Sequence, residues 1–456
     1  MMHRGEPRAP VGEASAGAPT STWKEPPSWL PSTLHSLAYR DYFLLIVGQV
    51  SNSLGQWMDM VARSIMIIAL TGSAVQLGLI TLARGVPAMV LGPIAGLLAD
   101  RMDRRVLMLI AKSLNMVLSL VFAALVVSGK MELWHLYATT ILRGLLMAFD
   151  QPARQALLPA LVPPHLLVNA VALNMGIMQL TRIISSVLAG VIITLWAKVF
   201  AFPETDARAF GGVYIAIFIV YIVAIVATYL LHVPAGGRVA RTQEPWFVTF
   251  ADGIRFAWHH PVILSILVLI AVQSIFGLPY LQIFIPWLAI KVMNIGTGGT
   301  TMLMAASGAG SLAGAIVVAT LGQRLRHRGR IIIISLILFG AALAALGITS
   351  MLPMVVIVGI TLPVLPLAMI LLVGVGQTGI MSIKNTLLLE STPNELRGRV
   401  MSFLSLDRGF TSLGGTMGGF AIALMGGPYA LALFGILCAF GAIAVGALSP
   451  RLRTKD

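Results

Sequence analysis

The sequence predicts an all-α integral membrane protein with twelve transmembrane helices in two pseudo-repeated halves of six. Hydrophobic residues make up 57% of the 456 positions and the mean hydropathy is +0.90, and a soluble fold has too little interior to bury so much apolar surface. Apolar runs of about 20 residues, long enough to cross the hydrocarbon core as helices, recur along the chain, whereas the period-2 pattern of a barrel does not. The lipid bilayer is therefore an expected partner.

The predicted spans follow one another with short polar connections. In chain order they cover residues 42–70, 75–99, 104–128, 133–152, 166–197, 211–232, 262–291, 298–322, 330–351, 355–389, 397–424 and 429–448. Prolines inside several spans, including Pro279 and Pro286, are expected to bend their helices. The glycines of GGTMGG (414–419) are expected to let neighbouring helices approach closely.

Polar segments divide the chain into domains. Residues 39–232 form the first six-helix half and residues 261–449 the second. Residues 1–38 are polar and rich in proline, with no apolar segment after a basic start, which predicts a disordered cytoplasmic tail rather than a signal peptide. Residues 450–456 form a second cytoplasmic tail, and residues 233–260 form a cytoplasmic linker.

The linker contains a candidate amphipathic helix. PWFVTFADGIRFAW (245–258) places Trp246, Phe250, Ile254 and Trp258 on one helical face, which suits a helix lying on the cytoplasmic membrane surface. An ordinary connector packed on the bundle explains the pattern equally well.

The basic residues predict topology. Most of the 31 Lys and Arg residues fall in the tails and in the even-numbered connections, while the other side holds only Lys130, Lys198, Arg208 and Lys291. By the positive-inside rule, both termini of this multi-pass protein are cytoplasmic and it lies in the inner (cytoplasmic) membrane. The net charge of +14 therefore reports topology, and we expect no binding to nucleic acid.

Several classes of function are not predicted. The lone cysteine, Cys438, excludes an intrachain disulfide and a cysteine-based metal site. No GxxxxGK[ST] loop is present, so the chain has no nucleotide-driven motor of its own. We expect a monomer without metal or cofactor, and not an enzyme.

The chain repeats itself. RQALLPALVPPHLLVNAV (154–171) aligns with KNTLLLESTPNELRGRVM (384–401), so that Arg154 matches Lys384 and Pro163 matches Pro393. Parallel halves of this kind are the architecture of many secondary transporters, with the substrate path between the halves near the midplane.

Five motifs carry a resemblance to a known family. GLLADRMDRR (96–105) resembles the G-x-x-x-D-R-x-x-R-R signature between helices 2 and 3 of the major facilitator superfamily. Four further runs are similar to its branch that contains the enterobactin exporters: WMDMVARSIMIIALTGSAVQLGL (57–79), FDQPARQALLPALVP (149–163), FADGIRFAWHHP (250–261) and NELRGRVMS (394–402). The resemblance implies the major facilitator fold and proton-coupled export of a small organic solute, such as a siderophore, a drug or an acidic or phenolic metabolite.

The charged signature predicts a latch at the cytoplasmic gate. Its candidate members are Gly96, Asp100, Arg101, Arg104 and Asp150. Asp100 ends the second helix and Arg104 begins the third, so a tight turn brings opposite charges together, and Asp150 closes the fourth helix on the same face. Asp103 replaces the glycine usual in the signature and stiffens the expected turn. The alternative is a solvated loop that only sets topology, the role expected of Arg105.

Basic residues inside the spans predict a positively charged cavity. An intramembrane charge costs upward of roughly 2.5 kcal/mol, so each needs a partner or a wet cavity. Lys112 is expected to snorkel to the surface. The candidates for the substrate cavity are Arg63, Arg84, Arg182 and Arg408, which favour an anionic or phenolic substrate. Pairing with helix carbonyls is the structural alternative for any one arginine.

Proton coupling has three candidate residues, Asp59, Arg143 and Asp407. Asp59 lies four residues before Arg63, so the two side chains share a helical face and can pair. Arg143 resembles the fourth-helix arginine that the superfamily often associates with coupling. RIISSVLAG (182–190) lacks the Gly-Pro pair of the antiporter signature, which leaves the direction of transport open.

Two alternatives to a proton-coupled exporter remain. The first is an importer of the same fold, and flux direction in vesicles separates it from an exporter. The second is a nontransporting sensor or scaffold. The intramembrane charges argue against a scaffold, which gains nothing from their insertion cost.

Overall fold

The computed structural model describes most of the chain. The described residues are Pro27, Trp29, Arg255 and the ranges 31–101, 103–203, 206–232, 258–321, 327–353, 355–357, 360–391 and 406–450. Most of the predicted linker helix and most of both predicted tails lie outside these residues. The end of the N-terminal tail is ordered, contrary to the prediction, because Ser32–Ala38 forms a 3₁₀ helix, η1, and Ser36 Oγ donates to Asn169 Oδ1 at 2.5 Å.

The first half consists of long helices close to the predicted spans. They are α1 (Arg40–Thr71), α2 (Ala74–Arg101), α3 (Arg104–Val127), α4 (Leu133–Leu157), α5 (Leu167–Val199) and α6 (Gly211–Tyr229). Three short 3₁₀ helices, η2 (Leu158–Ala160), η3 (Pro164–Leu166) and η4 (Ala207–Phe210), lie in the connections. α1 ends where Gly72 adopts a left-handed conformation, with φ 60°, which glycine tolerates without a steric penalty.

The second half begins with a broken helix. It comprises α8 (Pro261–Val272), the π-helix η5 (Gln273–Gly277), the 3₁₀ helix η6 (Leu278–Tyr280), α9 (Phe284–Trp287) and the π-helix η7 (Leu288–Val292). Pro279 and Pro286 lie within the irregular part, and each lacks the N–H that a regular helix needs. The bend predicted from these prolines is therefore a series of breaks.

The remaining elements include one departure from the all-helical prediction. They are α10 (Gly296–Leu321), α11 (Arg328–Thr349), β1 (Val355–Ile357), β2 (Ile360–Leu362), α12 (Val364–Ser391), α14 (Leu406–Met425) and α15 (Gly427–Leu448). β1 and β2 pair antiparallel, with Val356 opposite Thr361. The predicted tenth span therefore starts too early, because its first residues are rich in β-branched side chains and end at Pro363.

The helical membrane architecture is confirmed. Nine helices among the described residues are long and apolar enough to cross a membrane. α1, α4 and α14 are also long, but they carry charged residues such as Asp59, Arg143 and Asp407, which lower their hydropathy. Every predicted span overlaps a described helix, the seventh overlapping the broken one.

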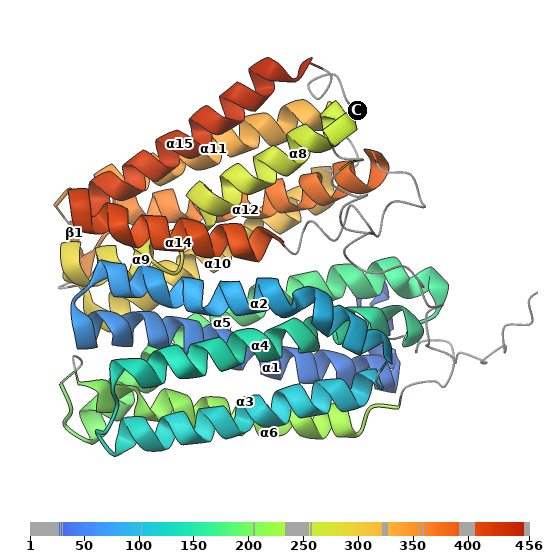
Figure 1. The fold of residues 1–456 in the computed structure, drawn as a ribbon, viewed down its shortest axis with the longest axis horizontal. Helices are drawn as coiled ribbons and strands as arrows, with labels where there is room; N and C mark the ends of the chain where they lie inside the picture. Colours follow the sequence, from blue (N-terminus) through green and yellow to red (C-terminus); the bar gives the residue numbers. More distant parts are fainter. Residues whose placement is uncertain are drawn as a thin grey trace, which may run out of the picture.

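The two halves lie side by side and diverge toward one end (Figure 1). They approach each other near β1 and α9 and separate toward the end that carries the C-terminus. α2 packs on α14, and α5 packs on α10. A Cβ atom on Gly78 would lie 3.0 Å from the backbone oxygen of Gly415, so close helix packing explains this part of GGTMGG, as predicted.

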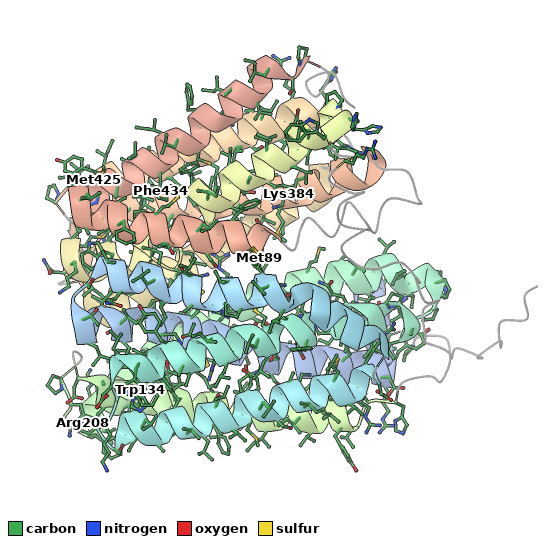
Figure 2. The ribbon with its side chains drawn as sticks, viewed as in Figure 1. Met89, Trp134, Arg208, Lys384, Met425 and Phe434 are labelled. Atoms are coloured by element: carbon green, nitrogen blue, oxygen red, sulfur yellow. The ribbon has the colours of Figure 1, made fainter. Side chains whose placement is uncertain are left out.

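Labelled side chains mark the ends of the bundle and the boundary between the halves (Figure 2). Trp134, Arg208 and Met425 lie at the end opposite the C-terminus, whereas Met89 of α2 lies at the boundary between the halves. The start of α1 and the end of α15 lie at one end of the bundle (Figure 1). At this end the backbone N–H of His232 donates to Asp41, and Ser265 near the start of α8 hydrogen-bonds Ser449. We call it the terminal end.

Candidate functional site

A cavity of about 420 Å³ lies between the two halves. Its walls come from α1, α2, α4 and α5 in the first half and from η6, the residues after it, and α14 in the second. Trp57 and Gln282 line its central part, and Arg154 and Asp407 line it near the terminal end of α4 and α14. The cavity therefore extends from the middle of the bundle toward the terminal end, and the broken helix at Pro279 forms part of its wall.

A buried ion cluster lies beside this cavity in the first half. Asp59 Oδ1 is 2.8 Å from Arg63 Nη2 and 3.3 Å from Arg143 Nη1, and Asp59 is only 3% exposed. The spacing correctly predicts the pair on α1. Arg143 reaches the same carboxylate from α4, so the structure brings two of the three coupling candidates together.

Arg63 does not line the cavity, contrary to the prediction. Its Nη1 atom donates to the backbone oxygen of Leu136 at 3.1 Å and to the hydroxyls of Thr139 and Thr140 at 3.0 Å each, and its guanidinium lies 4.9 Å from the centre of the Phe122 ring. The side chain is therefore directed at α3 and α4. The hydrogen bond to the Leu136 carbonyl matches the alternative stated from the sequence, in which an arginine pairs with a helix carbonyl instead of lining a cavity.

Arg182 also lies outside the cavity wall. It projects from α5 into the second half, where its guanidinium donates to Ser307 Oγ at 2.6 Å and to Ser311 Oγ at 3.4 Å on α10. It also donates to Tyr280 OH and to Gln377 Oε1, both at 3.2 Å. All four partners are uncharged, and the residue is only 3% exposed. Arg182 therefore joins the halves, which no sequence pattern predicted.

Arg84 and Arg408 do line this cavity, and their role in binding a substrate stays a prediction. Arg408 of α14 donates to Gln151 Oε1 of α4, a contact between the halves. Asp407 also lines the cavity and accepts a hydrogen bond from Ser274 of η5. Asp407 therefore lies in the other half from the Asp59 cluster, and the structure does not join the two carboxylates.

The predicted latch is described only in part. The side chains of Gly96, Asp100 and Arg101 lie outside the described residues. Asp103 caps α3, because its carboxylate accepts hydrogen bonds from the backbone N–H groups of Arg105 and Val106 at 2.8 and 3.3 Å.

Two other charges of this region have described contacts. Arg105 donates to the backbone oxygen of Tyr229 at the end of α6. Asp150 accepts from Asn52 at 3.3 Å and lies 3.8 Å from Arg154, and its place in the latch stays a prediction.

Sequence reasoning missed the neutral polar residues that hold the charges. Ser119 accepts from Arg143 at 2.8 Å, and Thr228 accepts from Lys112 at 2.6 Å. Lys112 is only 2% exposed, so the expectation that it snorkels is wrong. The available signal was the presence of these hydroxyls and amides within otherwise apolar spans. Among the described residues, no group of three or more His, Cys, Asp or Glu residues is arranged to hold a metal ion.

Two helical halves around a cavity that both of them line are the architecture of many secondary transporters. The chain belongs to the Major Facilitator Superfamily, whose family model matches residues 45–416, as the sequence motifs predicted. Members of this family are multi-pass membrane transporters and not enzymes.

Known relatives support the same family. The staphyloferrin A transporter of Staphylococcus aureus (strain NCTC 8325 / PS 47) is 31% identical over 146 residues, which are 31% of this chain and only 36% of that protein. The multidrug efflux pump Tap of Mycolicibacterium fortuitum is 24% identical over 432 residues, 91% of this chain and 96% of the pump. The solved structure of a D-xylose-proton symporter has a TM-score of 0.71 at 14% identity and covers 92% of this chain and 100% of its own, which supports the fold alone.

Proposed function

We propose that the protein is a proton-coupled exporter of a small organic solute that works by alternating access. The observation that supports this best is the cavity of about 420 Å³, because both halves form its walls and it extends toward one end of the bundle. Cavities of this size hold drug-sized molecules. Rocking of the halves about the interface would move the opening from one side of the membrane to the other.

The direction of transport rests on the relatives and on the charge pattern. The aligned Tap protein is a multidrug efflux pump, and another relative is a macrolide efflux protein of Streptococcus pyogenes. The excess of basic residues at the terminal end supports a cytoplasmic location for both termini in the inner membrane. The cavity would then receive its solute from the cytoplasm. An importer of the same fold remains the second candidate, since the structurally similar D-xylose-proton symporter is named for cotransport with protons.

Proton coupling is assigned to Asp59. Its carboxylate is shared by Arg63 and Arg143, so a proton on Asp59 would weaken both ion pairs at once. Since the three residues come from α1 and α4, whose neighbouring side chains Trp57 and Met147 line the cavity, protonation would loosen helices that contact the solute. Asp407 is the reserve candidate in the second half.

The test is flux measured in proteoliposomes with an imposed pH gradient. Accumulation of acidic, phenolic and cationic compounds in cells with and without the protein first identifies a solute. For inside-out protein, we expect that solute to concentrate in the lumen when the lumen is acidic and the flux to stop when a protonophore collapses the gradient. Accumulation from an acidic exterior into right-side-out vesicles would instead establish import. Solute flux that does not depend on the pH gradient would contradict proton coupling. Absence of flux for every solute that binds would favour a sensor or scaffold.

A further inference from the structure

The cavity wall carries an excess of positive charge. Its lining includes three arginines, Arg84, Arg154 and Arg408, and two aspartates, Asp150 and Asp407. Arg154 is 3.8 Å from Asp150, so these two charges offset each other. Asp407 accepts from Ser274, and it also attracts Lys384 on α12. Arg84 and Arg408 are therefore the two cavity cations without a carboxylate within 4.0 Å among the described residues.

These two arginines come from opposite halves, and their backbones approach each other where α2 crosses α14. A Cβ atom added to Gly85 would lie 3.3 Å from the backbone oxygen of Arg408, which shows how closely the two helices approach here. The positive charges of Arg84 and Arg154 act unfavourably on Arg408, and the neighbouring Asp407 offsets them in part. Gln151 is the uncharged partner of Arg408. Two guanidinium groups without a carboxylate partner in a partly desolvated wall are costly unless an anion offsets their charge.

The rest of the cavity suits an apolar molecular body. Trp57, Met60, Met147 and Met178 contribute aromatic and thioether surface from the first half, and Pro279 faces them from the second. Methionine side chains adapt to irregular ligand shapes, and ligand cavities combine such surfaces with a few placed polar groups. An apolar wall beside an arginine pair matches a solute with an apolar body and one anionic group.

We propose that Arg84 and Arg408 together bind a carboxylate of the transported solute, while its apolar body packs on Trp57 and the methionines. The proposal rests on the proposed function in one respect, that this cavity is the transport site. Arginine binds carboxylates through paired, charge-assisted hydrogen bonds. Since one arginine belongs to each half, the bound carboxylate also connects the halves at the point where α2 crosses α14.

The test compares an acid with its uncharged amide. Binding of radiolabelled naphthaleneacetate and naphthaleneacetamide to the purified full-length protein is measured by scintillation proximity. The wild-type protein is expected to bind the acid more tightly than the amide. Arg84→Gln and Arg408→Gln should each weaken acid binding about tenfold, the effect of losing a charged hydrogen bond, and change amide binding less than about twofold. Arg208→Gln, far from the cavity, is the matched control and should leave both affinities unchanged.

Two results would overturn the proposal. One is a wild-type protein that binds the acid no more tightly than the amide, an outcome that needs no variant to fold. The other is unchanged acid affinity in Arg84→Gln and Arg408→Gln proteins that melt at the wild-type temperature. Because the assay measures binding without flux, acid preference without proton-driven transport would contradict only the proposed function. Proton-driven transport of solutes without acid preference would contradict only the arginine pair.

Discussion

Asp59 shows how much of a charged site a sequence contains. Its pairing with Arg63 follows from a spacing of four residues on one helix, and the structure places the two charged groups 2.8 Å apart. The second partner, Arg143, comes from another helix, and spacing along the chain does not indicate which helices are neighbours. The threonines that hold Arg63 carried no distinctive pattern, because hydroxyls are common in membrane helices, where they bond to their own backbone.

The buried pair of Lys112 and Thr228 gives a prediction on stability. Each is 2% exposed, and the Lys112 ammonium donates to the Thr228 hydroxyl at 2.6 Å. Thr228→Val leaves that charge without its acceptor and should lower stability by about 1–3 kcal/mol. The double variant Lys112→Met, Thr228→Val removes both partners and should recover most of the loss. Melting temperatures of the four proteins in one detergent measure the coupling, and additive effects would show that the contact contributes nothing.

The loop between α5 and α6 gives a prediction on pH. Hydrogen bonds from the Arg208 side chain hold the pKa of Asp206 below its ordinary value of 3.8. A lowered pKa in the folded state means that this interaction stabilises the fold above that ordinary value and is lost as the pH falls through the folded pKa. Asp206→Asn should therefore lower the melting temperature slightly near neutral pH, and the difference should shrink as the pH falls below 3.8. A difference that is constant with pH would exclude the ion pair as its cause.

At the scale of elements, apolar periodicity predicted helices well and irregular backbone poorly. The prolines of the seventh span indicated a bend, but the π-helices around them depend on packing that is remote in sequence. The apolar run before Pro363 was assigned to a helix, whereas Val355–Ile357 and Ile360–Leu362 form a hairpin. A short apolar run does not distinguish a strand from a helix by periodicity, and its β-branched residues and the following Pro363 were the local indications.

The interface of α5 with α10 leads to a prediction on conformation. Arg182 holds the second half through four hydrogen bonds to uncharged groups, so Arg182→Met should favour separation of the halves at the end opposite the termini. Spin labels at Val199→Cys and Gly298→Cys in a Cys438→Ala background report this distance by pulsed electron resonance. We expect a larger population of long distances than in the parent protein. Arg208→Met, which loses contacts only within the first half, serves as the control and should leave the distribution unchanged.

If the spin-label distances in the Arg182→Met protein also matched those in the parent protein, Arg182 would not hold the two halves together at this end.

The connection between α2 and α3 leads to a prediction on turnover. Asp100→Asn and Arg104→Ala should slow transport several-fold and leave solute affinity within about threefold, because these two residues belong to the proposed gate between α2 and α3. Initial rates and equilibrium binding are measured on the same preparations. If properly inserted variants transport at the wild-type rate, the charged signature GLLADRMDRR (96–105) only sets the topology of the chain.

At the scale of the whole molecule, the sequence predicted which residues are charged within the membrane but not where they point. Arg84 and Arg408 line the cavity, whereas Arg63 turns into the first half and Arg182 crosses to the second. Apolar patterning fixes the position of a helix along the membrane normal, and its rotation depends on packing against neighbouring helices. All four arginines were placed in the cavity because every one needed a polar environment, a condition that neutral hydroxyls also satisfy.

The central claim is that Asp59 couples proton movement to rearrangement of the two halves. Transport of an identified solute into proteoliposomes, driven by an imposed pH gradient, tests it most directly with Asp59→Asn beside Asp407→Asn and the wild type. Asp59→Asn should bind the solute with wild-type or higher affinity and no longer concentrate it in response to the gradient, because the proton-accepting group is gone. An Asp59→Asn protein that still concentrates solute would contradict the claim, and loss of the response only in Asp407→Asn would transfer the role to the second half.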